Sequence, residues 1–236
     1  MFFKKNKQAS KKTLARQLIT VREPKSVVSE QFKTIRTNIN FSMPDEDLKT
    51  LIITSSTPGE GKSTNSSNIA VVFAQSGKKV LLVDSDMRKP TAHHTFALKN
   101  VRGLSNLLTR QFTLEEVVNE TKIPNLSVIT SGPIPPNPAE LLASQTMDRF
   151  IETALQQFDL VIFDAPPVLS VTDAQIMSNK CDGTILVVHS VKGQKDEVAK
   201  AKEMLDSSKA NILGVILNYY QLDKDHYYYQ YYGEVE

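Results

Sequence analysis

Residues 51–64 read L-I-I-T-S-S-T-P-G-E-G-K-S-T, from Leu51 to Thr64. Apolar, strand-like residues lead into a turn of Ser, Thr, Pro and Gly, and a helical pattern begins at Lys62. This order of strand, turn and helix is typical of a phosphate-binding loop, in which backbone N–H groups and the N-terminus of a helix converge on an anion. The stretch therefore predicts a site for a nucleoside triphosphate rather than a turn that binds nothing.

The residue types in this loop match that chemistry. Gly59 and Gly61 let the backbone approach phosphates without an intervening Cβ. Lys62 can reach the terminal phosphates, and the Ser63 hydroxyl can bind Mg²⁺. Ser56 stands where the strict loop pattern has its first glycine. The residues predicted to contact the nucleotide are Pro58, Gly59, Glu60, Gly61, Lys62, Ser63 and Thr64.

Strand-like and helix-like patterns alternate along the chain from about residue 49. Alternation of continuous apolar strands with helices predicts an α/β fold of the P-loop NTPase type, with a mostly parallel sheet flanked by helices on both faces. The predicted strands after the loop are 80–84, 126–130, 160–164, 184–189 and 212–217, and the predicted helices are 26–40, 62–75, 138–158 and 194–207. Residues 91–124 give no firm pattern.

Three aspartates follow or end two of the apolar strands. Asp84 and Asp86 lie at the end of L-L-V-D-S-D-M-R, and Asp164 ends L-V-I-F-D-A-P-P. Because the carboxyl ends of parallel strands meet at one edge of a sheet, all three are expected to face the nucleotide. Mg²⁺ takes one or two carboxylates besides phosphates, so Asp86 and Asp164 are the predicted metal ligands together with Ser63, and Asp84 is the predicted base. Each aspartate could instead cap a helix or turn.

Length and composition favour one large domain. The chain has 236 residues, 40% of them hydrophobic and 23% charged, which is ordinary for a globular protein. No apolar run reaches the roughly 18–20 residues of a membrane span, and no signal-peptide pattern opens the sequence. Phe2 stands where N-myristoylation needs glycine. A single cysteine, Cys181, suits a reducing cytoplasm.

The first residues form a basic arm. Residues 1–22 contain seven lysines and arginines and no acid, namely Lys4, Lys5, Lys7, Lys11, Lys12, Arg16 and Arg22. Such an arm can contact anionic lipid or nucleic acid, or can be a solvated tail. The predicted organisation is a basic arm over 1–23, a nucleotide-binding domain over 24–217 and a separate tail over 218–236.

The tail holds every tyrosine in the chain. All seven fall in the last 18 residues: Tyr219, Tyr220, Tyr227, Tyr228, Tyr229, Tyr231 and Tyr232. A strand or a contact patch for a partner would be alternatives, but the tail has almost no aliphatic residues to accompany them. Residues 218–232 can extend about 50 Å at roughly 3.3 Å per residue, which reaches the nucleotide site of the same or a neighbouring molecule. These tyrosines are therefore predicted to be phosphoryl acceptors.

Together, these motifs resemble the bacterial tyrosine kinases of capsule and exopolysaccharide synthesis, specifically their stand-alone cytoplasmic subunits in Gram-positive bacteria. The resemblance covers about residues 24–232 and also includes S-G-P-I-P-P-N-P-A-E-L-L at 131–142. It implies ATP·Mg²⁺-dependent phosphorylation of tyrosine, with Lys62 and Ser63 on ATP and Asp84, Asp86 and Asp164 at metal and base positions. The implied acceptors are Tyr227, Tyr228, Tyr229, Tyr231 and Tyr232.

The resemblance also implies an assembly and a location. The family's Glu-x-x-Arg-x-x-Arg motif for ring formation reads Glu30, Lys33 and Arg36 here, and lysine lacks the planar fork of arginine. A transmembrane activator protein of the polysaccharide operon is the implied partner, alongside other copies of the chain and protein tyrosine substrates. This places the protein in the cytoplasm at the inner face of the membrane, with no nucleic acid expected.

Two other functions share parts of this pattern. Partitioning ATPases of the chromosome- or septum-positioning type have the same architecture, but they usually place a second lysine early in the loop, where this chain has S-S-T at 55–57. They also lack a tyrosine tail. A regulatory scaffold that binds nucleotide without catalysis is the third interpretation, and it would bind ATP without forming ADP or labelling tyrosine.

Overall fold

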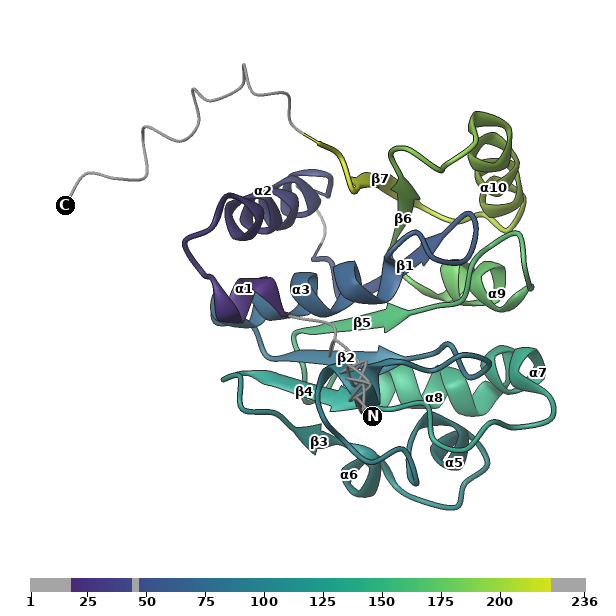
Figure 1. Ribbon diagram of the computed structural model, residues 1–236. Helices are drawn as coiled ribbons and strands as arrows, with labels where there is room; N and C mark the ends of the chain where they lie inside the picture. Colours follow the sequence, from purple (N-terminus) through teal and green to yellow (C-terminus); the bar gives the residue numbers. More distant parts are fainter. Residues whose placement is uncertain (1–17, 44–46, 222–236) are drawn as a thin grey trace, which may run out of the picture.

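The apolar strands form one sheet in the computed structural model, which describes residues 18–43 and 47–221 (Figure 1). Within those residues the sheet has seven strands in the order β3-β4-β2-β5-β1-β6-β7. All neighbouring strands run parallel except β3 and β4. The strands are β1 (Thr50–Ser55), β2 (Val80–Asp84), β3 (Asn119–Glu120), β4 (Leu126–Ile129), β5 (Leu160–Asp164), β6 (Gly183–His189) and β7 (Ile212–Asn218). The predicted mostly parallel sheet is confirmed.

Helices cover both faces of this sheet, as predicted. Helices α1 to α3 lie on one face, and α8, α9 and α10 lie on the other (Figure 1). In the described part of the chain the helices are α1 (Ile19–Arg22), α2 (Val27–Phe41), α3 (Lys62–Gln75), α4 (Ala92–Thr95), α5 (Leu104–Leu108), α6 (Leu114–Val117), α7 (Pro138–Ala143), α8 (Gln145–Ala154), α9 (Asp173–Lys180) and α10 (Lys195–Ser207).

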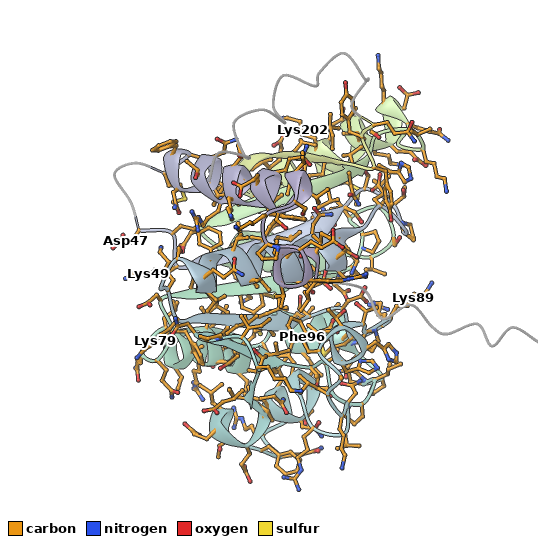
Figure 2. The ribbon with its side chains drawn as sticks, turned by 60° about the vertical axis from the view of Figure 1, so that its left-hand side comes forward. Asp47, Lys49, Lys79, Lys89, Phe96 and Lys202 are labelled. Carbon is orange, nitrogen blue, oxygen red and sulfur yellow. The ribbon has the colours of Figure 1, made fainter. Side chains whose placement is uncertain are left out.

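The central strands are apolar along their whole length because both of their faces are covered. Every residue of β1, β2 and β5 is buried, which removes the polar alternation of a half-exposed strand. Figure 2 shows Lys49 and Lys79, which precede β1 and β2, at one end of the sheet and Lys89 at the other. The phosphate-binding loop and the three aspartates therefore lie together at the Lys89 end.

Helix α2 begins where the sequence predicts it. The Ser26 hydroxyl caps the helix by accepting a hydrogen bond from the backbone N–H of Ser29. The apolar side of α2 packs against α3 through Phe32 and Ile39, which are buried. The shorter α1 contacts α3 as well. The buried Thr20 on α1 donates hydrogen bonds from its backbone N–H and its hydroxyl to the side-chain oxygen of Asn68 on α3.

The single helix predicted over 138–158 was wrong, because two helices meet at Ser144. This residue has an extended backbone with ψ of 154°, and its hydroxyl accepts from the backbone N–H of Met147 to begin α8. Pro138 is the first residue of α7, as expected. The Asn137 side chain does not cap that helix and instead donates to the Glu140 carboxylate.

Residues 91–124, which gave no firm pattern, form three short helices and the edge strand β3. Leu104 and Leu114 are buried in the same core as α8 and α9. This segment therefore completes the core beside β4, and only its first residues, after β2, reach the predicted nucleotide site.

Candidate active site

The loop between β1 and α3 adopts a backbone conformation that favours glycine. Gly59 and Gly61 have φ of +88° and +95°, in the left-handed region. A Cβ on Gly61 would clash with Nδ2 of Asn218, the last residue of β7. Position 61 therefore requires glycine for both conformational and steric reasons, whereas nothing lies within 4 Å of a Cβ at Gly59, where the backbone is open to an incoming phosphate.

Glu60 connects this loop to strands β6 and β7 through hydrogen bonds. Its side chain is buried, and its carboxylate accepts from the backbone N–H groups of Thr57 at 2.8 Å and His189 at 3.2 Å. The Asn218 side chain donates to the Glu60 carbonyl at 2.9 Å. Because the carboxylate is engaged inside the protein, a contact between Glu60 and a nucleotide would come from its backbone.

Lys62 lies at the centre of the predicted polar residues. Its Nζ is 2.9 Å from Oδ2 of Asp86, 3.4 Å from Oδ1 of Asp164 and 3.2 Å from Oγ of Ser63. Burial by itself lowers the pKa of the ammonium, but the carboxylates of Asp164 and Asp86 outweigh burial and raise it. The group is therefore a fixed positive charge between two buried carboxylates.

Asp84 is the most enclosed of the three aspartates. In the sheet it pairs directly with Asp164, so the two strand ends are neighbours as predicted. Its Oδ2 accepts from the backbone N–H groups of Thr91 and Ala92, both at 2.8 Å, where α4 begins. Its Oδ1 has no hydrogen-bond partner among the described residues. Burial, followed by the charge of Asp164, raises the pKa of Asp84 to about 7.

The oxygens around Lys62 suit a hard divalent cation. The Ser63 hydroxyl and the carboxylates of Asp86 and Asp164 all lie within 3.4 Å of one positively charged atom, and oxygen is the ligand type that Mg²⁺ takes. Within residues 18–43 and 47–221, no group of three or more His, Cys, Asp or Glu side chains could hold a metal without other ligands. A metal here would therefore need phosphate oxygens among its ligands in addition to these side chains, which is the usual situation for Mg²⁺.

A cleft of about 360 Å³ opens beside the loop. Of the predicted nucleotide contacts, all except Glu60 line it, and so does Asp86, whereas Asp84 and Asp164 lie behind its wall. The lining residues are Pro58, Gly59, Gly61, Lys62, Ser63, Thr64, Asp86, Arg88, Lys89, Thr91, Pro166, Pro167, Ser170, Val171 and Tyr219.

Sequence reasoning missed two features of this cleft. Arg88 forms two hydrogen bonds of 3.0 Å with the carboxylate of Asp173, the first residue of α9, which is fully buried. The Tyr219 ring stacks on His189 with 4.4 Å between ring centroids. No short-range signal joins these pairs, because their members are 85 and 30 residues apart; the predicted strand 212–217 ends two residues before Tyr219, which was the one hint that this tyrosine lies near the cleft.

The residues predicted for assembly lie away from the cleft, on α2. Lys33 forms an ion pair of 2.6 Å with Glu30 on the same helix. Arg36 donates from Nη1 to the carbonyl of Val72 on α3 at 3.0 Å. The predicted acceptors, Tyr227, Tyr228, Tyr229, Tyr231 and Tyr232, lie outside the described residues, as do residues 1–17 of the basic arm.

Comparison with known proteins gives a consistent set of relatives. A family model described as an AAA domain matches residues 48–195. The chain is 51% identical to the tyrosine-protein kinase YwqD of Bacillus subtilis (strain 168), over 93% of this chain and 92% of that protein. It is 44% identical to the putative tyrosine-protein kinase CapB of Staphylococcus aureus, over 96% and 99%.

Solved structures agree. The chimerical protein CapA2B2 superposes with a TM-score of 0.84 at 47% identity, covering 87% of this chain and 90% of that one. The septum site-determining protein MinD of Pyrococcus horikoshii has a TM-score of 0.61 at 23% identity, over 75% and 72%. The second likeness shows a shared fold alone, so it does not support the partitioning interpretation. In the described part of the chain, no helix has the length and apolar character to cross a membrane.

Proposed function

The chain belongs to the bacterial tyrosine-protein kinases of capsule and exopolysaccharide loci, and on this basis we propose that it transfers the γ-phosphoryl group of ATP to its own C-terminal tyrosines. The single observation that carries the proposal is the position of Lys62 Nζ between Ser63, Asp86 and Asp164 beside the glycine-containing loop. The acceptors are Tyr227, Tyr228, Tyr229, Tyr231 and Tyr232.

The loop and α3 bind the phosphates. The left-handed Gly59 has open space where a Cβ would lie, and the N-terminus of α3 contributes a positive partial charge. When nucleotide binds, Lys62 leaves Asp86 and Asp164 and pairs with the phosphates. Its charge therefore neutralises the carboxylates in the empty cleft and the phosphates in the occupied one. The hydrogen bonds of Glu60 with Thr57 and with Asn218 stabilise the conformation of the loop.

The fit of Ser63, Asp86 and Asp164 around one cationic atom supports a magnesium site at these residues. Mg²⁺, when bound, neutralises part of the charge on the transferring phosphate. The release of Lys62 from the two aspartates frees the same carboxylates that would hold the metal. Nucleotide and metal are therefore expected to bind together rather than separately.

The tyrosine hydroxyl supplies the attacking oxygen. Its bond to phosphorus forms as the bond between that phosphorus and the departing ADP oxygen breaks, and the phenolic proton passes to a carboxylate. We assign the proton to Asp84, whose Oδ1 has no partner in the described structure. Since Asp84 is buried behind the cleft wall, residues 85–91 must shift before the phenol reaches it.

Assembly and location follow the family. The outward side of α2 carries the exposed Val27 and Val28 beside Glu30 and Lys33, which supports contact between copies and transfer from one copy to the next. The similar structure named CapA2B2 supports an activating partner. We infer a transmembrane activator, peripheral attachment at the inner membrane surface, and regulation of extracellular polysaccharide synthesis.

Phosphosite mapping tests the proposal. Purified protein is incubated with ATP·Mg²⁺, with and without a cytoplasmic peptide of the activator, and phosphate is expected on residues 227–232. To test transfer between copies, a Lys62→Met chain with an intact tail is mixed with an active chain whose five acceptor tyrosines are phenylalanine. Label on the Lys62→Met chain supports transfer between copies, and its absence contradicts it. No label on residues 227–232 of the wild type, even with activator, overturns the proposed function.

A further inference from the structure

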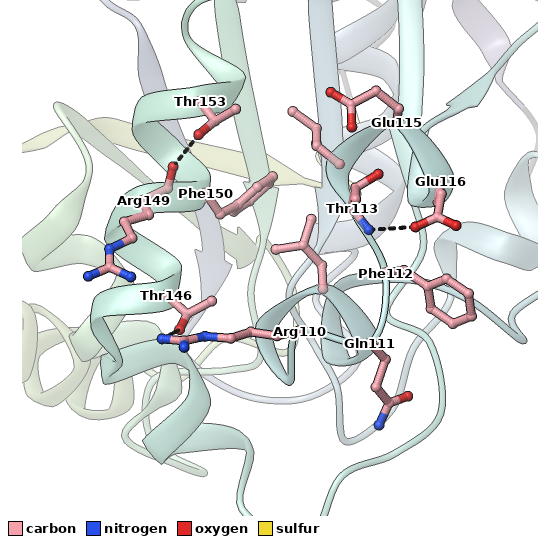
Figure 3. Close-up of a pocket in the computed structure, with 12 residues that line it drawn as sticks. Arg110, Gln111, Phe112, Thr113, Glu115, Glu116, Thr146, Arg149, Phe150 and Thr153 are labelled. Carbon is pink, nitrogen blue, oxygen red and sulfur yellow. Dashed lines mark hydrogen bonds between the residues drawn. The ribbon is translucent and has the colours of Figure 1, made fainter.

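A second groove, of about 460 Å³, is shown in Figure 3. Its buried lining residues Leu107, Leu114 and Phe150 belong to the core on the face of the sheet opposite α3. The groove runs between α8 and the segment joining α5 to α6, and it shares no lining residue with the nucleotide cleft. Phe112 and Phe150 are among its lining residues; Phe150 is only 4% exposed, and the Arg102 guanidinium lies over the Phe112 ring, 4.6 Å from the ring centroid. An apolar groove of this size has room for an aromatic side chain and its neighbours.

One wall of the groove is cationic. Arg110 follows α5 with φ of +60° and extends to α8, where its Nη2 lies 3.5 Å from the Thr146 hydroxyl. Arg149 lies one turn further along α8, and in the described part of the chain its guanidinium has no hydrogen-bond or ion-pair partner. Two guanidinium groups beside an apolar surface are suited to a planar or tetrahedral anion.

The acidic residues of the opposite wall are already engaged. The Glu116 carboxylate accepts from the backbone N–H of Thr113 at 2.8 Å and so begins α6. Hydrogen bonds from its own backbone and from the Thr113 hydroxyl lower the pKa of Glu115. The glutamates therefore lie at the start of α6, whereas the Arg110 guanidinium extends to Thr146 beside Arg149 on α8.

We propose that this groove binds a phosphotyrosine of the C-terminal segment, residues 222–236. The aromatic lining suits the ring and the two arginines suit the phosphate. Four acids against one lysine make the segment anionic, and Lys224 precedes the tyrosines where it can approach the Glu115 wall. The proposal rests on the proposed function, because that reaction supplies the phosphotyrosine.

The reach of the segment is sufficient. β7 lies at one edge of the sheet, and the groove lies toward the other edge, near β4. Six strand spacings of about 4.8 Å separate the two edges by roughly 29 Å. The five acceptor tyrosines follow residue 221 by 6 to 11 residues, which span at most about 20 to 36 Å. The later tyrosines can therefore reach the groove of their own molecule and all five can reach that of an adjacent one, and phosphorylated tails would be held away from the nucleotide cleft.

Synthetic peptides test the proposal without any kinase activity. Five peptides of residues 222–236, each with one phosphotyrosine, are compared with the unphosphorylated peptide by fluorescence anisotropy. The protein is the full chain with its five acceptor tyrosines replaced by phenylalanine. At least one phosphopeptide is expected to bind about tenfold or more tightly than the unphosphorylated peptide. Failure of all five overturns the inference, whereas the proposed function is decided separately by phosphosite mapping.

Matched variants locate the binding site. Combined Arg110→Gln and Arg149→Gln is expected to abolish the preference for phosphate without changing the melting temperature. Lys202→Gln, which removes an exposed cation on α10 far from the groove (Figure 2), is expected to retain it. Excess MgADP is expected to leave the phosphopeptide bound. Equal binding by the double variant, or displacement by MgADP, overturns the inference.

Discussion

At the scale of single residues, Lys62 balances the charge of Asp86 and Asp164. The side chains of all three are largely buried, with exposed fractions of 12%, 5% and 3%. Removing the ammonium leaves two buried carboxylates without a cation, which is costly. We predict that Lys62→Met abolishes tyrosine labelling and also lowers the free energy of unfolding by roughly 3 kcal/mol in metal-free buffer, as measured by urea denaturation followed by circular dichroism.

Two controls separate the loss of charge from the loss of shape. Lys62→Arg keeps a cation near Asp86 and should lose much less stability. Added Mg²⁺ without nucleotide should raise the melting temperature of Lys62→Met more than that of the wild type, because it can take the place of the missing ammonium. A Met variant as stable as the wild type in metal-free buffer would refute this account.

Asp84 should make stability depend on pH in an unusual direction. Its pKa is raised to about 7 in the folded protein from an ordinary 3.8, so between these values the native state binds more protons than the unfolded chain. The contribution of Asp84 to the free energy of unfolding therefore falls as pH rises from about 4 to about 7 and is level above that. Asp84→Asn keeps an oxygen for the N–H groups of Thr91 and Ala92 but does not titrate.

The measurement is urea denaturation of wild type and Asp84→Asn at several pH values, with chelator present. The stability of the variant relative to the wild type should increase across the interval from about pH 4 to 7. Parallel stability curves would show that Asp84 does not hold its proton as described.

At the scale of elements, the phosphate-binding loop offers a matched pair of glycines. Gly59→Ala and Gly61→Ala both place a side chain at positive φ, which costs about 1–2 kcal/mol. Only the Cβ at Gly61 meets Asn218, while nothing lies within 4 Å of a Cβ at Gly59. We predict that Gly61→Ala is the more destabilising in chemical denaturation, and that Asn218→Ala in the same chain recovers part of the difference. Equal losses would contradict the clash.

The pair Arg88 and Asp173 joins the segment after β2 to the start of α9. Two hydrogen bonds to a fully buried carboxylate make this a strong pair. A double-mutant cycle with Arg88→Ala and Asp173→Asn should give a coupling energy of about 1–3 kcal/mol. The exposed pair Lys202 and Asp206 on α10 is the control and should give about 0.5 kcal/mol or less. Equal coupling in the two pairs would contradict this ranking.

Elements with a strong local signal could be predicted from the sequence, and those set by distant contacts could not. The strands β2 and β5 have the predicted bounds, because a buried parallel strand is apolar along its whole length. The break at Ser144 could not be predicted, because a serine can occur inside a helix or cap the start of a new one. Here its hydroxyl caps α8, although the apolar pattern continues across it. In the site, the meeting of Asp84 and Asp164 followed from parallel strands, whereas the partner of Arg88 depended on the packing of α9.

At the scale of the whole molecule, α2 should control association between copies. Its inner side packs on α3, and its outer side presents Val28 next to the ion pair of Glu30 and Lys33. We predict that Val28→Glu shifts the population toward monomer and that Lys33→Arg, which restores a planar fork, shifts it toward larger assemblies. Size-exclusion chromatography with light scattering measures both. Val101→Glu, at another exposed valine, is the control and should change nothing.

The placement of the tyrosines also decides how this protein can be observed by light. The chain has no tryptophan, and its seven tyrosines all follow residue 218, so the folded core contributes only the weak emission of its phenylalanines. Intrinsic fluorescence will therefore report little of global unfolding. It will instead respond to changes around Tyr219, which lines the nucleotide cleft, and around the tyrosines that follow it. Tyrosine emission from the unlabelled protein can therefore be used to follow nucleotide binding and tyrosine modification.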